Sequence, residues 1–191
     1  LAFGLYKREV FKRIGGYDIE LVKNQDDEFN FRMIQNGLKI WIDHSIKSFY
    51  YPRSSLINLF KQYFLYGFYK IRVFQKRGSY SSLRHLIPLL FVLSIILSVC
   101  FHIITDYNLP IVILFLLYLS LSIVFTIFET IKNIKRTFSF IFLPICYFII
   151  HIAYGFGSFL GIFYFMNKWN DRVVKDKYFN VDIFSKNAPQ H

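Results

Sequence analysis

The chain has 191 residues, of which 54% are hydrophobic and only 18% are charged, so it has the length of one ordinary domain but is too apolar for a simple soluble one. Its 23 Lys and Arg residues outnumber 12 Asp and Glu residues, and the formal net charge of +11 favours an anionic partner such as phosphate, a lipid headgroup or a nucleic acid. The 24 Phe, 14 Tyr and 2 Trp residues exclude a disordered chain.

The two cysteines, Cys100 and Cys146, each lie within a long apolar run. Neither a disulfide framework nor a zinc cluster can be built from them, and we interpret both as small buried or lipid-facing side chains. No secretory signal peptide is expected, because the first residues lack a charged region followed by a short apolar core. Since the chain starts without Met and Leu1 falls in a strand-like segment, we expect a piece of a longer protein.

Residues 1–52 are predicted to form a mixed α/β region. Aromatic and β-branched residues favour strands at residues 38–42 and 47–51. Apolar residues at helical spacing predict a short helix over residues 27–36, and Gly37 is expected to end it. A region of this size buries only a marginal core, so we expect it to need an N-terminal partner.

Residues 53–85 form a basic region, in which a single helix is predicted over residues 54–77. Ser54 or Ser55 suits its N-cap, and Gly78 suits its end. Apolar residues recur every three or four positions, with Lys and Arg elsewhere, which is typical of an interfacial helix lying among lipid headgroups. Basic and aromatic residues also suit nucleic-acid binding, but the immediate continuation into an apolar segment argues against it.

Three apolar segments follow, at residues 86–104, 109–128 and 138–166. The first two have about the 20 residues that a membrane-spanning helix needs, and the four residues between them predict a tight antiparallel hairpin. The third is 29 residues long and is interrupted by one proline and three glycines. We therefore predict about three transmembrane helices, followed by a basic tail at residues 167–191.

The charge distribution gives an orientation but leaves one conflict. Basic residues before the first apolar segment and after the second belong on the cytoplasmic side. The tail at residues 167–191 is also basic, although three successive spans would place it outside. Residues 138–166 form either a tilted span with an outer tail, which we take as the expectation, or a re-entrant or broken element that returns the tail to the cytoplasm.

The densest polar cluster is the run from Asn24 to Glu28, which includes Asp26 and Asp27. Three consecutive carboxylates repel one another. Such a group usually either occupies a helix N-terminus, where the macrodipole favours anions, or performs acid–base or metal chemistry. From the pattern alone, both interpretations stay open.

Residues 1 to about 90 resemble the acceptor-side half of a family 2 glycosyltransferase of GT-A fold, of the membrane-bound succinoglycan type. The resemblance rests on the glycine turn at residues 15–18 (GGYD) and on residues 25–32 (QDDEFNFR), which match the family motif E-D-x-E-(L/F)-x-x-R. It implies that Asp26 is the catalytic base and that Glu28 and Arg32 support it, while Gln25 replaces the usual Glu.

The resemblance also implies further residues of the acceptor or diphosphate site. Asp27 belongs to this group, and Arg53, Lys61 and Gln62 are candidates for contacting a donor or lipid diphosphate, although the two basic residues also suit headgroup anchoring. The family's nucleotide-binding half, its D-x-D metal motif and a Q-x-x-R-W motif have no counterpart in this sequence. A divalent Mg or Mn ion is expected in the complete enzyme, with its ligands in the nucleotide-binding half. No metal is therefore expected to be bound by this chain alone.

The implied function is inverting transfer of a sugar from a nucleotide-sugar donor to a polyprenyl-linked saccharide, in exopolysaccharide or cell-surface glycan synthesis. The implied location is the cytoplasmic face of the inner cell membrane, with anionic lipids as partners. This chain alone is expected to be inactive, because it has no donor site. The alternative is a non-catalytic small polytopic membrane protein that binds anionic lipid or anchors a partner.

Overall fold

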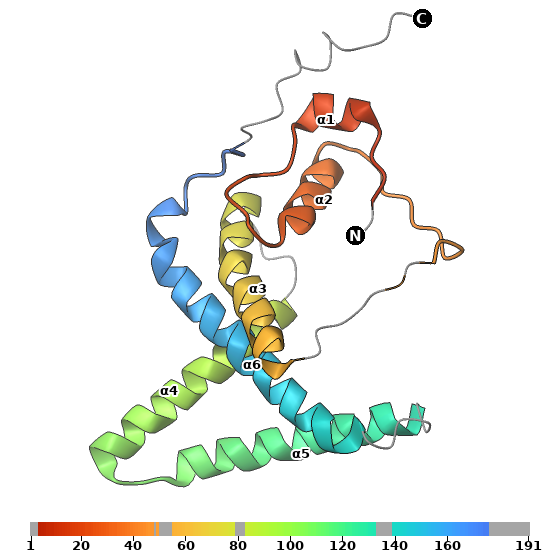
Figure 1. Cartoon of the computed structure of the whole chain (residues 1–191). Helices are drawn as coiled ribbons and strands as arrows, with labels where there is room; N and C mark the ends of the chain where they lie inside the picture. Colours follow the sequence, from red (N-terminus) through yellow and green to blue (C-terminus); the bar gives the residue numbers. More distant parts are fainter. Residues whose placement is uncertain (1–3, 48, 50–54, 79–82, 133–138, 176–191) are drawn as a thin grey trace, which may run out of the picture. The chain divides into compact units, whose positions relative to one another are not determined.

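A computed structural model describes residues 4–47, 49, 55–78, 83–132 and 139–175. This part of the chain is helical (Figure 1), and it begins with α1 at Arg8–Ile14, α2 at Gln25–Gln35 and α3 at Leu56–Arg77. The 3-10 turn η1 at Leu83–Leu86 leads into α4 at Ile87–Thr105, α5 at Leu109–Lys132 and α6 at Ser139–Tyr164, followed by the turn η2 at Met166–Lys168.

The chain divides into two compact units, and α3 and α6 contribute to both. The first unit comprises Leu1–Tyr51, Tyr69–Ser81 and Gly161–His191. The second unit comprises Pro52–Phe68 and Ser82–Leu160. Each unit therefore joins segments that lie far apart in the sequence.

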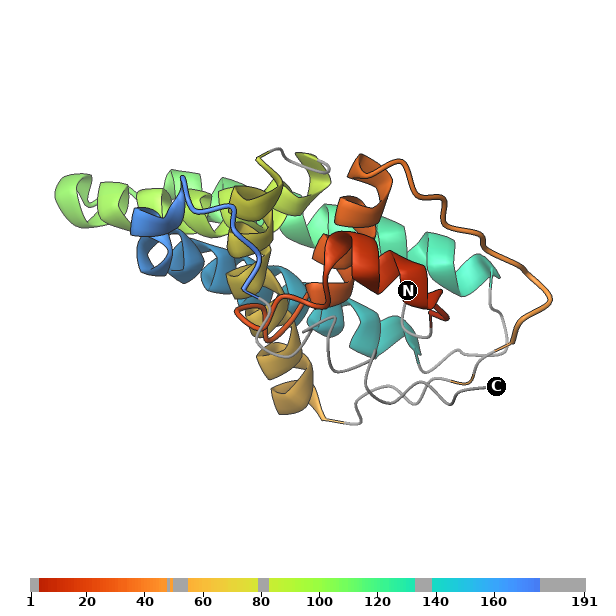
Figure 2. The same cartoon turned by 90° about the horizontal axis from the view of Figure 1, so that it is seen from above.

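In the first unit, α1 packs on α2 (Figures 1 and 2). The predicted short helix is confirmed as α2, which starts two residues earlier than expected. Gly37 ends it with a φ of +72°, and its N–H donates to the carbonyl of Ile34 at 3.0 Å. This left-handed conformation favours glycine, as the sequence predicts. The buried apolar side chains come from three segments of the chain: Leu21, Phe29, Met33, Ile71, Val73, Phe74 and Phe165.

The α/β prediction is wrong for the described residues, which contain no strand. Residues 38–42 have an irregular backbone, and Trp41 in this segment is 89% exposed. A strand forms only when a neighbouring strand satisfies its backbone N–H and C=O groups, and residues 38–42 have none in the described part of the chain. The second predicted strand lies mostly outside the described residues, and those of its residues that are described, Lys47 and Phe49, are not in a strand.

The second unit contains the apolar helices. Three helical segments are long and apolar enough to cross a membrane, namely Arg84–Thr105, Leu109–Lys132 and Ile141–Tyr164. The predicted hairpin is confirmed, because α4 and α5 contact each other and only three residues join them. This protein is therefore a membrane protein by the length and composition of its helices.

Two glycines allow α3 and α6 to approach closely within the second unit. A Cβ atom at Gly67 would overlap the carbonyl oxygen of Tyr154, and one at Gly157 would overlap the carbonyl oxygen of Phe64. The hydroxyl of Ser158 donates to the carbonyl of Gly67 at 3.2 Å. Small residues at a helix crossing let the backbones meet, as at other membrane helix interfaces.

Candidate functional site

The acidic run lies in the first turn of α2. Asn24 precedes the helix with a φ of +62° and makes no side-chain capping hydrogen bond, so Asp26, Asp27 and Glu28 are inside the helix. Carboxylates in a first turn interact favourably with the positive end of the macrodipole. The structure therefore supports the macrodipole part of the helix-terminus interpretation, but not capping by an Asp.

Arg32 of α2 binds the glycine turn at residues 15–18. Its guanidinium pairs with the buried Glu28 carboxylate in a fork, with Nε to Oε1 at 2.8 Å and Nη2 to Oε2 at 2.9 Å. The same group donates to the carbonyls of Ile14 and Gly16, the latter at 2.7 Å. Bidentate pairs of this kind fix both position and orientation. The structure thus brings together the two motifs that the sequence singled out.

Asp27 is held by two cations from the end of α3. Lys70 Nζ lies 2.5 Å from Oδ2, and Arg77 Nη2 lies 2.7 Å from Oδ1. Burial alone would raise the pKa of Asp27, but the hydrogen bonds and positive charges of Lys70 and Arg77 outweigh it, and the pKa is lowered. Arg77 also stacks on Phe31, with the guanidinium carbon 4.5 Å from the ring centroid.

Asp26 lies half-buried beside a cluster of aromatic rings. Tyr17 packs on the fully buried Phe29 with ring centroids 4.7 Å apart, and Tyr6 meets Phe29 edge-on at 5.1 Å. Burial raises the pKa of Tyr17, and Tyr6 and the negative charge of Asp26 raise it further. Because Tyr17 is 38% exposed, part of this aromatic residue is accessible near a carboxylate.

A second charged cluster lies in the first unit and was missed from the sequence. Arg72 is completely buried, and its Nη2 donates to Glu20 at 2.9 Å and to Asp171 at 3.0 Å. Lys76 pairs with both Asp18 and Glu20, the latter at 3.0 Å. Burial alone would raise the pKa of Glu20, but the hydrogen bonds from Arg72, Lys168 and Lys76 lower it.

This cluster changes the interpretation of α3. The amphipathic pattern predicts that its basic residues contact lipid headgroups, but Lys70, Arg72, Lys76 and Arg77 are buried and paired with carboxylates. The available sequence signal was the four-residue spacing of Arg72 and Lys76 between buried apolar residues, which places both cations on the face that packs against protein.

Three further residues were predicted for the site, namely Arg53, Lys61 and Gln62. Lys61 is exposed on the first half of α3, in the second unit. Gln62 Nε2 donates to the hydroxyl of Tyr66 at 3.0 Å. Arg53 lies outside the described residues. A diphosphate-binding function of these three residues stays a prediction.

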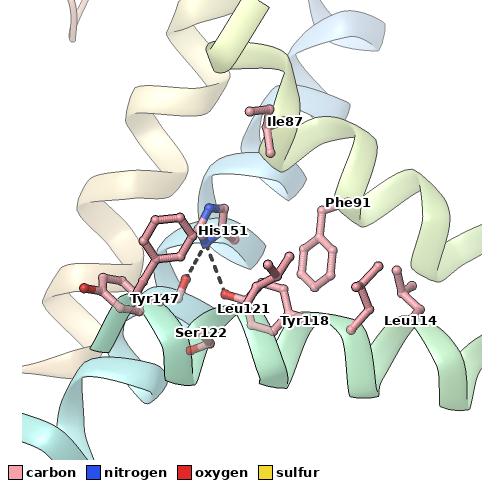
Figure 3. Close-up of a pocket in the computed structure, with 10 residues that line it drawn as sticks. Ile87, Phe91, Leu114, Tyr118, Leu121, Ser122, Tyr147 and His151 are labelled. Atoms are coloured by element: carbon pink, nitrogen blue, oxygen red, sulfur yellow. Dashed lines mark hydrogen bonds between the residues drawn. The ribbon is translucent and has the colours of Figure 1, made fainter. Parts of the chain in front are cut away.

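A pocket of about 530 Å³ lies among α4, α5 and α6 in the second unit (Figure 3). Its polar contacts centre on His151, whose Nδ1 lies 2.8 Å from the carbonyl oxygen of Tyr147 and 3.1 Å from the hydroxyl of Tyr118. Apolar side chains make up most of the lining. His151 thus bonds to a neighbouring helix, which is the common arrangement for a histidine in an apolar segment.

Metal-ligating residues are dispersed in the described part of the chain. No group of three or more His, Cys, Asp or Glu side chains there could hold a metal ion. Cys100 is exposed, Cys146 is half-buried, and both are free thiols. The described residues therefore do not fit a resident metal.

Two curated proteins are similar to this chain. The succinoglycan biosynthesis protein ExoA of Rhizobium meliloti (strain 1021) is 39% identical over 85 residues, which are 44% of this chain and 26% of that protein. The dolichyl N-acetyl-alpha-D-glucosaminyl phosphate 3-beta-D-2,3-diacetamido-2,3-dideoxy-beta-D-glucuronosyltransferase of Methanococcus voltae is 31% identical over 163 residues, which are 85% of this chain and 46% of that protein.

No family model matches the chain, and no solved structure is significantly similar to it. The alignments span less than half the length of both relatives. Over the residues that these alignments cover, the chain is similar to glycosyltransferases, and this similarity supports the resemblance to the family 2 glycosyltransferases.

Proposed function

We propose that this protein, in its complete form, transfers a sugar from a nucleotide-sugar donor to a lipid-linked saccharide acceptor, with Asp26 as the general base. The observation that carries the proposal is the arrangement at the start of α2. There Arg32 fixes the glycine turn, two cations fix Asp27, and Asp26 lies beside the exposed ring of Tyr17. Aromatic faces next to carboxylates suit sugars, which have apolar faces and many hydroxyls.

The chemistry requires one proton acceptor. The acceptor hydroxyl oxygen forms a bond to the anomeric carbon of the donor sugar, while the bond from that carbon to the nucleoside diphosphate breaks. The hydroxyl proton passes to a carboxylate oxygen of Asp26, and the diphosphate leaves as an anion. Attack on the face opposite the leaving group inverts the configuration at the anomeric carbon.

The contacts of Asp27 and Glu28 suit supporting roles. The Glu28 carboxylate is occupied by the fork with Arg32. The pKa of Asp27 is lowered by Lys70 and Arg77 against the effect of burial, which makes Asp27 a weaker proton acceptor. Asp27 and Glu28 then serve to hold α2 rigidly, so that Asp26 is positioned for the acceptor.

The wider assignments complete the proposal. In the complete enzyme, a GT-A fold at the cytoplasmic face of the inner membrane would bind the nucleotide sugar, and a polyprenyl-linked saccharide would be the acceptor. A divalent cation would neutralise the leaving diphosphate, with ligands outside the residues described. Lys61 and Gln62, with Arg53, would contact a diphosphate or anionic headgroups. The rival function, a non-catalytic lipid-binding or anchoring protein, has no specific observation in its favour.

The test is a pair of variants in the complete protein, purified in detergent. Asp26→Asn should lower turnover by about 10²–10⁴-fold, because it removes the general base while keeping the size of the side chain. The matched control, Glu9→Gln, removes an exposed carboxylate in the same unit and should leave turnover and thermal stability nearly unchanged. The assay follows transfer of labelled sugar from nucleotide sugars to polyprenyl-phosphate lipids. Full activity of folded Asp26→Asn would contradict the assignment.

A further inference from the structure

We propose that α6 does not carry the chain across the membrane, so that residues 165–175 lie on the same side as residues 4–35. Three helical segments are long and apolar enough to cross, and three crossings would put these two stretches on opposite sides. The inference is independent of the proposed function, since it rests on contacts within each unit and on hydropathy and charge.

The first observation is that the tail after α6 is part of the first unit. Lys168 Nζ lies 2.5 Å from Glu20 Oε1, and Arg72 pairs with Asp171 at 3.0 Å. The N–H of Ile19 donates to the carbonyl of Lys175 at 3.1 Å. These contacts join charged and backbone groups from three parts of the chain, and they cannot form across about 30 Å of hydrocarbon.

These contacts require an even number of membrane crossings between the end of α3 and the tail. The chain leaves the first unit after the end of α3 and re-enters it at Gly161. Because both points belong to one compact unit that contains many charges, they lie on one side of the membrane. The number of crossings between them must be even, so α4, α5 and α6 cannot all cross.

A contact inside the second unit argues against α4 and α6 crossing in the same direction. A Cβ atom at Gly155 would overlap the carbonyl oxygen of Pro88 and approach Val92 at 2.6 Å. If both segments crossed in the same direction, Pro88 would lie about 6 Å beyond the start of its segment and Gly155 about 21 Å beyond the start of its own. A difference of about 15 Å in depth is incompatible with this contact.

Hydropathy identifies α6 as the helix that does not cross. The windows in α4 and α5 have mean hydropathies of 2.7 and 2.8, against 1.7 for the window in α6. In addition, 28% of the α6 window is buried against protein, compared with 11% in each of the others. The joined pair α4 and α5 therefore crosses and returns, while α6 is the least suited to contact lipid all round.

The basic residues agree with this topology. Arg84 precedes α4, Lys132 ends α5, and Lys168 and Arg172 follow α6. With an even number of crossings all four lie on one side, as the positive-inside rule requires, whereas three crossings would separate the last two from the others. The conflict in the charge pattern is thereby removed.

The resulting position of α6 follows from its length. It has 26 residues and is about 39 Å long. With both ends on the same side, it does not span the hydrocarbon, and it packs beside α3, which it meets at Gly67 and Gly157. Tyr164 and Trp169 at its end are exposed and have the amphipathic rings that favour the headgroup region.

Cysteine labelling tests the topology in intact cells. In a Cys100→Ser, Cys146→Ser background, single variants Lys39→Cys, Tyr107→Cys, Lys132→Cys and Asn170→Cys report on the first unit, the α4–α5 turn, the end of α5 and the tail. All four positions are exposed, so the fold should tolerate them. A membrane-impermeant maleimide should label Tyr107→Cys directly, and the other three only after permeabilisation.

Two results would overturn the proposal. Labelling of Asn170→Cys but not Lys39→Cys in intact cells would mean an odd number of crossings. Labelling of Lys132→Cys from outside would mean that α6 crosses and another helix does not. As a second measurement, a short bismaleimide should cross-link the Ile19→Cys, Lys175→Cys pair within one chain, while the Ile19→Cys, Tyr107→Cys control pair should not react.

Discussion

The same two helices, α3 and α6, form different kinds of interface in the two units. In the second unit their backbones meet at Gly67 and Gly157, and the rings of Phe64 and Phe156 pack at 6.1 Å. In the first unit the end of α3 packs with the residues after α6 through polar contacts. Arg72 pairs with Asp171, and Gln75 donates to the carbonyl of Phe165 at 2.8 Å. One helix pair thus uses close packing at one end and buried ion pairs at the other.

This difference indicates a structural role for part of the basic surplus of the chain. A surplus of basic residues on an amphipathic helix suggests a lipid surface, yet at the end of α3 the cations neutralise carboxylates that follow the glycine turn and begin α2. The charges therefore hold the candidate catalytic segment to α3. Breaking each kind of interface should have effects of different size.

The largest effect is expected for Arg72→Met. Removing this fully buried cation leaves Glu20 and Asp171 without it, and breaking one side of a buried pair typically costs about 3–5 kcal/mol. The apparent melting temperature in detergent should fall steeply, and the sugar-transfer activity should be lost with the fold. The measurement is thermal unfolding of the purified variant.

Lys39→Met is the matched control for Arg72→Met. Lys39 is an exposed cation in the same unit, so its replacement should change the melting temperature little. If the two variants melted together near the unmodified protein, the buried cluster would not stabilise the first unit.

The next largest effect is expected for Gly157→Val. The added side chain would overlap the carbonyl oxygen of Phe64 and force α3 and α6 apart, and overpacking of this kind costs about 1–3 kcal/mol. Leu160→Val, at an exposed position of the same helix, is the control. Equal melting temperatures for the two variants would show that the close crossing does not stabilise the second unit.

Much of the helical fold could be predicted from the sequence, because local patterns determine it. The helix at α2, the stop at Gly37, the long helix α3 and the hairpin of α4 and α5 all follow from periodicity, glycine and hydropathy. The prediction of a strand at residues 38–42 was wrong, because a strand depends on a neighbouring strand that the local pattern does not encode. The sequence also did not predict that the basic side chains of α3 face protein carboxylates, because these partners are distant in the sequence.

For the candidate site, the sequence identified the two segments that meet, at residues 15–18 and 25–32, but not the contacts between them. The motif at residues 25–32 implied that Glu28 and Arg32 support Asp26, but it did not predict that these two residues pair with each other. The cations that hold Asp27 lie more than 40 residues away, and Glu20, Lys168 and Asp171 belong to no motif. Only the folded chain could show that the tail stabilises the glycine turn.

A smaller effect is expected from acid. The pKa of Glu20 is lowered in the fold, so its contribution to stability is complete above its ordinary value of about 4.5 and decreases as the pH falls below it. The melting temperature should therefore drop between about pH 5 and pH 3, and Glu20→Gln should flatten this drop at the cost of lower stability at pH 7. An unchanged pH profile in Glu20→Gln would contradict the role of Glu20 in the cluster.

The smallest effect is expected for Tyr118→Phe in the apolar unit. The change removes one hydrogen bond to His151 but keeps the ring that stacks on Phe91, with centroids 4.5 Å apart. His151 still has the carbonyl of Tyr147 as a partner, and hydrogen bonds between membrane helices contribute about 0.6 kcal/mol on average. The melting temperature should therefore fall by only a degree or two, far less than for Arg72→Met. Tyr118→Ala, which also removes the ring, should cost several times more, and a loss in Tyr118→Phe as large as in Tyr118→Ala would mean that the hydrogen bond, not the ring packing, stabilises this unit.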